Sequence, residues 1–144
     1  MISARRIAET LGGQSVLRER LADYAAVIHR ARAGLPFAAL DAVAKRYGVP
    51  VTRLAEILGL PARTLARRKK ERRLSAEESD HLVRLARVAA MAEDVLETRD
   101  NATEWLRTPN RALGGVAPID LLGTDLGAGQ VETILVRIDY GVYS

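Results

Sequence analysis

Apolar residues recur at the spacing of an α-helix over most of this chain, from Ser15 to Val88 and again close to the C-terminus. A helix that packs on a core shows apolar residues at positions i, i+3, i+4 and i+7, whereas a half-buried strand shows alternation. Alternation persists for only a few residues, although residues 136–143 can also be read as a strand. Aromatic residues make up 4% of the sequence and hydrophobic residues 48%, so the core must consist of Leu, Ile, Val and Ala. The sequence therefore predicts an all-α fold.

Two helices are expected before residue 50. The first is expected to end near Gly34, with a buried stripe formed by Leu17, Leu21, Tyr24, Ala25 and Ile28. The second is expected to stop at Gly48 and Pro50, with a buried stripe formed by Phe37, Leu40, Ala44 and Tyr47. Both stripes have helical spacing, so both helices are expected to contribute one face to the core.

Four further helical pieces are expected in the second half, one of them a short helix over residues 101–107 that carries Trp105. A long helix is expected to start at Ser75, because Ser75 and Glu78 have the spacing of a capping box. Its buried side is expected to carry Leu82, Leu85, Ala89 and Leu96. Pro118 is suited to the first position of a short piece over residues 118–122. A last helix, capped by Gly141, presents the stripe Val131, Ile134, Leu135 and Ile138.

The sign of the charge changes near the middle of the chain. Residues 1–73 hold 16 Lys and Arg against 6 Asp and Glu, a net charge of +10, whereas residues 74–144 hold 6 against 12, a net charge of −6. Six of the cations fall between Arg67 and Arg73. Crowded like charges repel, so they favour a polyanionic partner, with a plain solvated helix face as the alternative. We expect a basic domain over residues 1–73 and an acidic domain over residues 74–144.

The most specific pattern of the basic half lies between Val51 and Arg68. With Val51 as the first position, leucines stand at positions four, eight, ten and fifteen: Leu54, Leu58, Leu60 and Leu65. Ala55 at position five lets two helices approach closely, and Gly59 at position nine suits a turn with positive φ. Arg68 stands at position eighteen, where an apolar residue is more usual. The pattern predicts a helix-turn-helix over residues 51–72; a helical hairpin with a solvated basic flank is the alternative.

Within this helix-turn-helix, Pro61 is expected to start the recognition helix, whose exposed early residues would face the major groove of DNA. Arginines can hold a guanine through two hydrogen bonds, and a threonine can contact a phosphate or a thymine methyl group. Lysines at the end of the helix are expected to contact phosphates, which adds affinity without sequence information. The expected DNA-binding residues are Arg63, Thr64, Arg67, Arg68, Lys69 and Lys70.

A long series of spaced landmarks extends over roughly residues 60–144. They are residues 67–68, 73–80, 82–88, 101–106, 109–122, 127, 131–132, 135–138 and 140–143. Together they resemble the central part and the toxin-binding domain of the Xre/MbcA/ParS family of antitoxins. The resemblance implies an Xre/Cro-like helix-turn-helix region followed by a small helical toxin-binding domain.

The resemblance also implies a role in a type II toxin–antitoxin system. Antitoxins of this kind bind their own operon through the helix-turn-helix and occlude a RES-domain toxin through the C-terminal domain. Such toxins resemble ADP-ribosyltransferases and consume NAD. The expected toxin-binding residues are Trp105, Asn110, Leu113, Gly114, Arg137, Tyr140 and Tyr143. Of these, Arg137, Tyr140 and Tyr143 are expected to obstruct the toxin's active site. For Trp105 the alternative is a core position, because a lone tryptophan is more often a core residue.

Two other classes of protein are alternatives to an antitoxin. An enzyme is disfavoured, because Gly127 and Gly129 have no third glycine and no preceding strand, and His29 and His81 have no readable catalytic partners. A stand-alone dimeric helix-turn-helix repressor shares every feature of the basic half, and only the acidic half separates the two interpretations. A homodimer is expected under both, because palindromic half-sites reward two-fold symmetry.

The remaining composition narrows the partners. The sequence has no cysteine and two histidines, so we expect neither a metal site nor a cofactor. The longest stretches without a charged residue are eight residues, whereas a membrane helix needs about 20 apolar residues. No secretory signal is evident at the N-terminus, so we expect a cytoplasmic protein without membrane contact.

Overall fold

The computed structural model describes residues 2–141, and this part of the chain is all-α, with no strand beyond two isolated bridges, Pro36 with Arg73 and Asn110 with Val116. The α-helices are α1 (Ala4–Thr10), α2 (Gly13–Leu17), α3 (Tyr24–Arg32), α4 (Phe37–Tyr47), α5 (Val51–Ile57), α6 (Ala62–Glu71), α7 (Ala76–Val95), α8 (Arg99–Arg107) and α9 (Asp125–Asp139). Two 3-10 helices, η1 (Arg111–Leu113) and η2 (Pro118–Leu121), separate α8 from α9.

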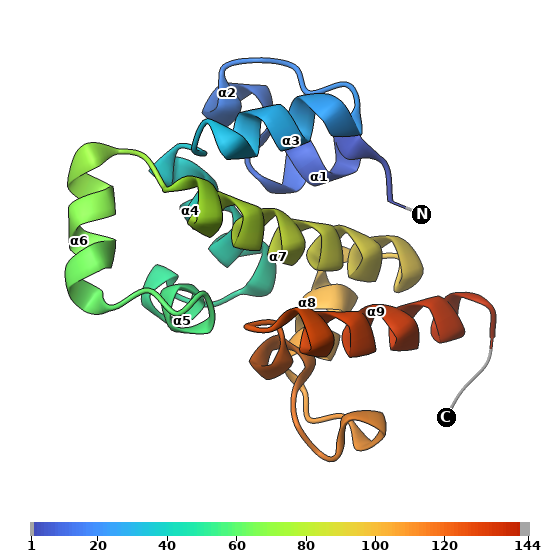
Figure 1. The fold of residues 1–144 in the computed structure, drawn as a ribbon. Helices are drawn as coiled ribbons and strands as arrows, with labels where there is room; N and C mark the ends of the chain where they lie inside the picture. Colours follow the sequence, from blue (N-terminus) through green and yellow to red (C-terminus); the bar gives the residue numbers. More distant parts are fainter. Residues whose placement is uncertain (1, 142–144) are drawn as a thin grey trace.

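The helix α7 runs through the middle of the molecule, and α1, α3, α4, α8 and α9 all pack against it (Figure 1). The predicted capping box is confirmed: the Ser75 hydroxyl accepts a hydrogen bond from the Glu78 amide at 3.1 Å, and the Glu78 carboxylate accepts one from the Ser75 amide at 2.8 Å. The buried face is rich in alanine, which lets the surrounding helices approach closely. It consists of Ser79, Leu82, Leu85, Ala86, Val88, Ala89, Ala90 and Ala92.

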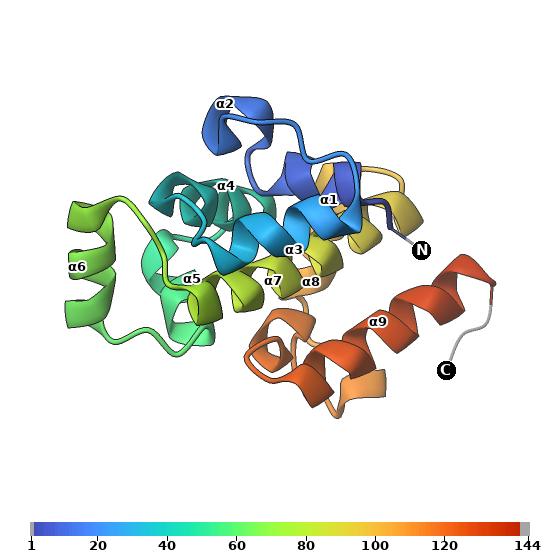
Figure 2. The ribbon, with the colours of Figure 1, turned by 45° about the horizontal axis from the view of Figure 1, so that its top comes forward.

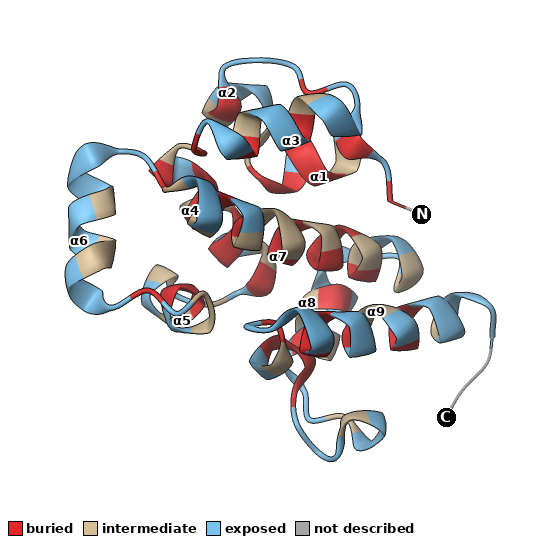
Figure 3. Cartoon of the chain, in the orientation of Figure 1, coloured by how far each residue is buried: buried red, intermediate tan, exposed pale blue. Residues whose placement is uncertain are grey.

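One hydrophobic core extends across both halves of the chain. It joins Ile7 and Leu11 of the first helices to Leu122, Val131 and Leu135 near the C-terminus, with α7 between them. The boundary expected between residues 73 and 74 therefore falls inside a single packed unit. Buried residues line the inner faces of the helices around α7, whereas α6 and the outer face of α9 are largely exposed (Figure 3).

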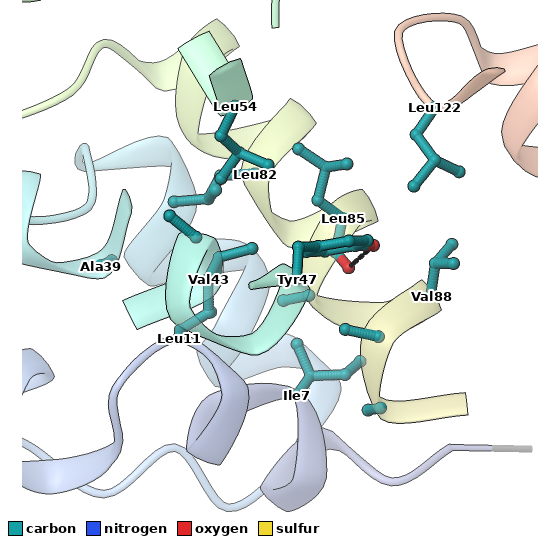
Figure 4. Close-up of a cluster of buried hydrophobic side chains, with 14 of the residues drawn as sticks. Ile7, Leu11, Ala39, Val43, Tyr47, Leu54, Leu82, Leu85, Val88 and Leu122 are labelled. Atoms are coloured by element: carbon teal, nitrogen blue, oxygen red, sulfur yellow. Dashed lines mark hydrogen bonds between the residues drawn. The ribbon is translucent and has the colours of Figure 1, made fainter. Parts of the chain in front are cut away.

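Tyr47 is the largest fully buried side chain of this core. Its hydroxyl donates a hydrogen bond to the Leu85 carbonyl of α7 at 2.7 Å, drawn in Figure 4 among the leucines and valines of the core. Burial, reinforced by the negative charges of Glu93 and Glu132, raises the pKa of the Tyr47 hydroxyl well above its ordinary value. The hydrogen bond therefore ties α4 to α7 with a neutral phenol.

The first predicted helix is wrong. The helix α2 ends at Leu17, because Arg18 adopts a left-handed conformation with φ of 63°, and Asp23 caps a separate helix α3. On α3 the side chains of Tyr24 and Ile28 are 44% and 51% exposed and Ala25 is exposed too, while Val27 and Ala31 are buried. Leu17 lies in α2, and Leu21 lies between α2 and α3. The periodicity placed both in the same helix as Tyr24 and Ile28, so the buried face predicted for α3 was wrong.

The helix α1 was missed by the periodicity argument, yet it packs extensively on α7. Two signals in the sequence indicate it in retrospect. The Ser3 side chain caps it by accepting a hydrogen bond from the Arg6 amide at 3.2 Å, and its buried apolar residues have helical spacing. They are Ala4, Ile7, Ala8 and Leu11.

The other predicted elements are confirmed with shifted ends. The helix α4 covers the predicted residues and ends at Gly48, whose φ is 66°. Pro118 begins η2, which is a 3-10 helix. The last helix starts at Asp125, six residues before Val131, because the Thr124 side chain caps it. Reading residues 136–143 as a strand is wrong as far as Asp139, where α9 ends.

Within residues 2–141, no helix is both long enough and apolar enough to cross a lipid bilayer. In the same part of the chain, no group of three or more His, Cys, Asp or Glu residues is arranged to hold a metal ion.

Replacing Tyr47 by phenylalanine is expected to lower the free energy of unfolding by about 1 kcal/mol, because the ring still fills its place and only the hydrogen bond to Leu85 is lost. Urea denaturation at neutral pH measures the change. Tyr140→Phe serves as the control, because this side chain is 79% exposed and its stability should not change. Equal stabilities of the Tyr47→Phe variant and the parent would contradict the tie between α4 and α7.

The same substitution has a pH dependence. Because the pKa of Tyr47 is raised by folding, its contribution is complete below the pKa of an unfolded tyrosine, about 10, and declines as the pH rises further. The parent should therefore lose more stability than Tyr47→Phe between neutral and strongly alkaline pH. Parallel losses in the two proteins would show that Tyr47 ionises as freely in the folded state as in the unfolded state.

Candidate functional site

The helices α5 and α6 form the predicted helix-turn-helix. Leu54 and Ala55 of α5 are buried, Gly59 in the turn has a φ of 72°, and Leu60 is only 8% exposed. The Leu60 amide donates a hydrogen bond to the Ala55 carbonyl at 2.8 Å, which closes the turn. Pro61 precedes the first residue of α6 rather than being part of the helix. The turn predicted from the spacing after Val51 is thus confirmed.

The helix α6 stands at one end of the molecule, away from α9 in both views (Figures 1 and 2). None of its ten residues is buried. Arg63, Arg67, Lys69 and Lys70 are exposed, whereas Thr64 is half-buried. Arg63 and Arg67 follow each other at one helical turn, so the two guanidinium groups share an outward face. The structure thus presents five of the six expected DNA-binding side chains on or beside the outer face of one protruding helix.

Arg68, the sixth expected contact, lies on the inner side of α6. Its Nε is 2.7 Å from Oε1 of Glu78 at the start of α7, and one of its terminal nitrogens is 3.1 Å from Oε1 of Glu71. The side chains of Arg68 and Glu78 are 19% and 13% exposed. This guanidinium is therefore engaged by two carboxylates within the protein.

The pKa values of this pair reflect the same contact. Burial opposes ionisation of Glu78, but the hydrogen bonds from Arg68 and from the Ser75 backbone outweigh it, so the pKa of the Glu78 carboxyl is lowered. The hydrogen bond to Glu78, followed by the one to Glu71, raises the pKa of Arg68. Both groups are therefore held in their charged forms.

A second candidate surface lies between the loop around η1 and the helix α9. The loop is closed by the Asn110 amide, which donates to the Val116 carbonyl at 3.1 Å, and by the Asn110 side chain, which accepts from the Ala112 amide at 2.9 Å. Gly114 and Gly115 complete the turn at φ of 71° and 85°. Between this loop and α9 runs an open groove, lined on the loop side by Ala112 and Leu113. Its α9 side is formed by Asp125, Leu126, Gly129, Gln130, Thr133, Ile134 and Arg137.

The outer face of α9 carries an apolar stripe that nothing covers in the described part of the chain. Leu126, Val136 and Tyr140 are 82%, 45% and 79% exposed, and Gly129 and Thr133 lie between them on the same face. These five residues alternate spacings of three and four, which is the pattern of a helix that packs against a partner helix. Three exposed large apolar side chains on one helix indicate an interaction surface.

The helix α9 is held in place by a close approach to η2. A Cβ atom at Gly127 would lie 2.0 Å from the Leu121 carbonyl oxygen, so only glycine permits this contact. At Gly129, on the outer face, a Cβ atom would meet nothing within 4 Å. The two glycines that resemble part of a dinucleotide-binding motif thus lie inside a helix, and Gly127 has a packing role.

The structure brings some of the expected toxin-binding residues together and separates others. Leu113 and Arg137 line the same groove, Gly114 lies at the tip of the loop, and Tyr140 is exposed at the end of α9. Asn110 shapes the loop through its hydrogen bonds. Trp105 is half-buried against the core on α8 and does not line this groove. Tyr143 lies outside the described residues.

Sequence reasoning missed Leu126 and Val136. Both are apolar residues outside the buried stripe of Val131, Ile134 and Leu135, and that position off the stripe was the available signal. Once α9 is known to start at Asp125, Leu126 belongs to its first turn and faces outward.

Two family models match adjacent parts of the chain. The antitoxin Xre-like helix-turn-helix domain matches residues 26–87. The antitoxin Xre/MbcA/ParS C-terminal toxin-binding domain matches residues 91–141. The first segment contains α5 and α6, and the second contains the η1 loop and α9.

Individual antitoxins and one toxin–antitoxin complex are also similar to this chain. An antitoxin Xre of Yersinia enterocolitica is 32% identical over 107 residues, which cover 73% of this chain and 72% of the relative. A Sphingobium protein named Prs ADP-ribosylating antitoxin is 36% identical over 80 residues, covering 49% and 50% of the two chains. A chain in the crystal structure of the M. tuberculosis MbcT–MbcA toxin–antitoxin complex is similar with a TM-score of 0.55 and 26% identity, covering 73% of this chain and 94% of that one.

The two glycines of α9 allow a matched test of how this surface is positioned. Gly127→Ala is expected to lower the free energy of unfolding by about 1–3 kcal/mol, because the new methyl group would overlap the Leu121 carbonyl. Gly129→Ala is expected to raise it by up to about 1 kcal/mol, because alanine favours a helix and the site is open. Chemical denaturation of both variants measures the difference. Equal effects of the two substitutions would contradict the close contact between α9 and η2.

Proposed function

We propose that this chain, which belongs to the Xre antitoxin family, binds and neutralises a cognate toxin through its C-terminal domain. The observation that carries the proposal is the exposed apolar stripe of α9 beside the η1 loop. This stripe lies within residues 91–141, the segment matched by the toxin-binding family model. An apolar helix face with a groove beside it suits burial against a protein partner better than contact with a small polar ligand.

We propose that residues 1–73 bind DNA and that residues 74–144 bind the toxin, although both segments contribute to one core. The chain acts as a binding protein and not as an enzyme. Its toxin is proposed to be a RES-domain protein that consumes NAD or transfers ADP-ribose. The sequence landmarks support this choice, and so does the similarity to a relative whose name refers to ADP-ribosylation. Both interactions are proposed to take place in the cytoplasm.

The C-terminal end of α9 is proposed to obstruct the toxin's active site. Arg137 lies at the end of the groove, and Tyr140 is 79% exposed one turn further along. A guanidinium can occupy a place meant for a cationic ring, and tyrosines can fill an aromatic pocket. Tyr143 is part of this proposal on sequence grounds alone. Leu113 and Gly114 are proposed to contact the toxin beside them, and Asn110 to hold their loop in shape through its hydrogen bonds. Trp105, half-buried on α8, is proposed as a toxin contact on sequence grounds alone.

The basic end of the molecule is proposed to repress the chain's own operon. Arg63 and Arg67 face outward on α6 and are proposed to read base edges, with Thr64 beside them. Lys69 and Lys70 are proposed to contact phosphates. A homodimer would place two such helices on palindromic half-sites. A stand-alone dimeric repressor is the alternative, and it would need the acidic half only as a dimerisation surface.

Leu126→Asp is expected to weaken toxin binding at least tenfold, because it places a charge within the apolar stripe that is proposed to contact the toxin. The side chain is 82% exposed, so stability should not change. Calorimetric titration of the purified toxin measures binding, and rescue of growth in cells expressing the toxin measures neutralisation. Ile28→Asp, at a 51% exposed apolar site on α3, is the matched control and should bind like the parent. Full neutralisation by Leu126→Asp would contradict the assigned surface.

Arg63→Ala is expected to cost about 1–3 kcal/mol of operator binding and to relax the preference at one base pair. Lys69→Ala is expected to weaken binding to all DNA sequences alike and to reduce the slope of log K against log salt by about one. Fluorescence anisotropy with operator and random duplexes over a range of salt concentrations measures both effects. Equal losses on the two duplexes for both variants would contradict the division into base and phosphate contacts.

A further inference from the structure

The recognition helix α6 has very little hydrophobic anchoring. None of its residues is buried, and only Leu65 packs at the edge of the core. Apolar burial is the usual way of fixing a helix on a protein. The orientation of α6 must therefore depend largely on what holds its two ends.

The N-terminal end is held by the turn. Leu60 is 8% exposed, and its amide donates to the Ala55 carbonyl of α5. The segment after the C-terminal end has one core residue, Leu74, which is 2% exposed, and is otherwise held by polar contacts. The segment that follows α6 pairs with the chain around the start of α4: the Phe37 amide donates to the Arg72 carbonyl at 3.0 Å, and the Leu74 amide donates to the Leu35 carbonyl at 2.9 Å. These contacts fix the segment after the helix, but they do not involve the side chains of α6.

Only one side chain of α6 reaches α7 by a polar contact within residues 2–141, and it belongs to Arg68. Its Nε donates to Oε1 of Glu78 at 2.7 Å. The same carboxylate oxygen accepts from the Ser75 amide at 2.8 Å, so it is fixed by the capping box of α7 before Arg68 binds it. A charge-assisted hydrogen bond to an acceptor that is already oriented is among the stronger polar contacts in proteins. At 19% and 13% exposure, the pair is also largely shielded from water.

From this geometry we infer that Arg68 and Glu78 are positioning residues of the DNA interface, which hold α6 at the angle at which Arg63 and Arg67 face outward. The role rests on the DNA binding proposed above. Arg68 occupies the position at which a helix-turn-helix more usually has an apolar residue, and here an ion pair with the first turn of α7 replaces that packing. Removing the charge of Glu78 is therefore expected to weaken DNA binding, although Glu78 is not one of the proposed DNA contacts.

The substitution Glu78→Gln tests the positioning role, because the role predicts weaker DNA binding and its absence predicts equal or tighter binding. A glutamine keeps the capping box, because its side-chain oxygen still accepts from the Ser75 amide, but it loses the charge that attracts Arg68. If Glu78 had no positioning role, removing a negative charge beside a DNA-binding helix would tighten binding or leave it unchanged. As a positioning residue, Glu78→Gln should weaken operator binding about fivefold and random DNA less. The matched control is Glu77→Gln, the exposed neighbour in the same first turn, which should bind at least as well as the parent.

Two further measurements complete the test on the full-length protein. Hydrogen exchange without DNA should be faster in residues 62–71 of Glu78→Gln than in Glu77→Gln, with the rest of the core unchanged. The double variant Arg68→Met, Glu78→Gln should bind the operator no more weakly than Arg68→Met alone, because both substitutions remove the same contact. Operator binding by Glu78→Gln that equals or exceeds that of Glu77→Gln would overturn the positioning role. Failure of the parent to bind any DNA would instead overturn the proposed repressor function, and this role with it.

Discussion

Burial of one face of α7 is the interaction on which the rest of the structure depends. Helices from both ends of the chain cover it: α1, α3 and α4 come from the first half, and α8 and α9 from the second. Its alanines permit short distances between helices, and Leu82, Leu85 and Val88 supply most of the apolar volume. The sign of the charge divides this chain in two, but its core does not. Two chemically different surfaces are therefore carried by one packed unit.

The two surfaces are held in different ways. The helix α6 stands away from the core and depends on a turn and on an ion pair, which suits a cationic helix that has to enter a groove of DNA. The helix α9 buries Val131 and Leu135 on its inner side, and only a glycine at residue 127 allows its first turn to approach η2. The segment around η2 also contacts the helix-turn-helix, because Arg53 of α5 forms an ion pair with Asp120. The frameworks beneath the two surfaces are thus in direct contact.

Much of this could be predicted from the sequence wherever the determining interactions are local. The capping box of Ser75 and Glu78, the stop at Gly48 and the spacing around Gly59 each depend on residues within one or two helical turns, and each is confirmed. The prediction failed between residues 11 and 34, where a left-handed Arg18 breaks a periodicity that looks continuous in the sequence.

The functional residues divide in the same way. The exposed residues of α6 follow from helical spacing. That Arg68 turns inward follows from a carboxylate ten residues away on another helix, which spacing does not reveal. Similarly, Leu126 becomes a surface residue only once Thr124 is known to start α9. Contacts between elements, together with the helix α1 and the break at Arg18, were not predicted from the sequence.

Hydrogen exchange of the full-length protein, alone, with the cognate toxin and with operator DNA, tests most directly whether one unit carries two separate surfaces. The toxin is predicted to protect residues 111–113 and 125–139 and to leave α6 unchanged, whereas operator DNA is predicted to protect residues 62–71 and to leave the outer face of α9 unchanged. Protection of α6 by the toxin without any protection of α9 would contradict the account, since the stripe on α9 would then have no partner.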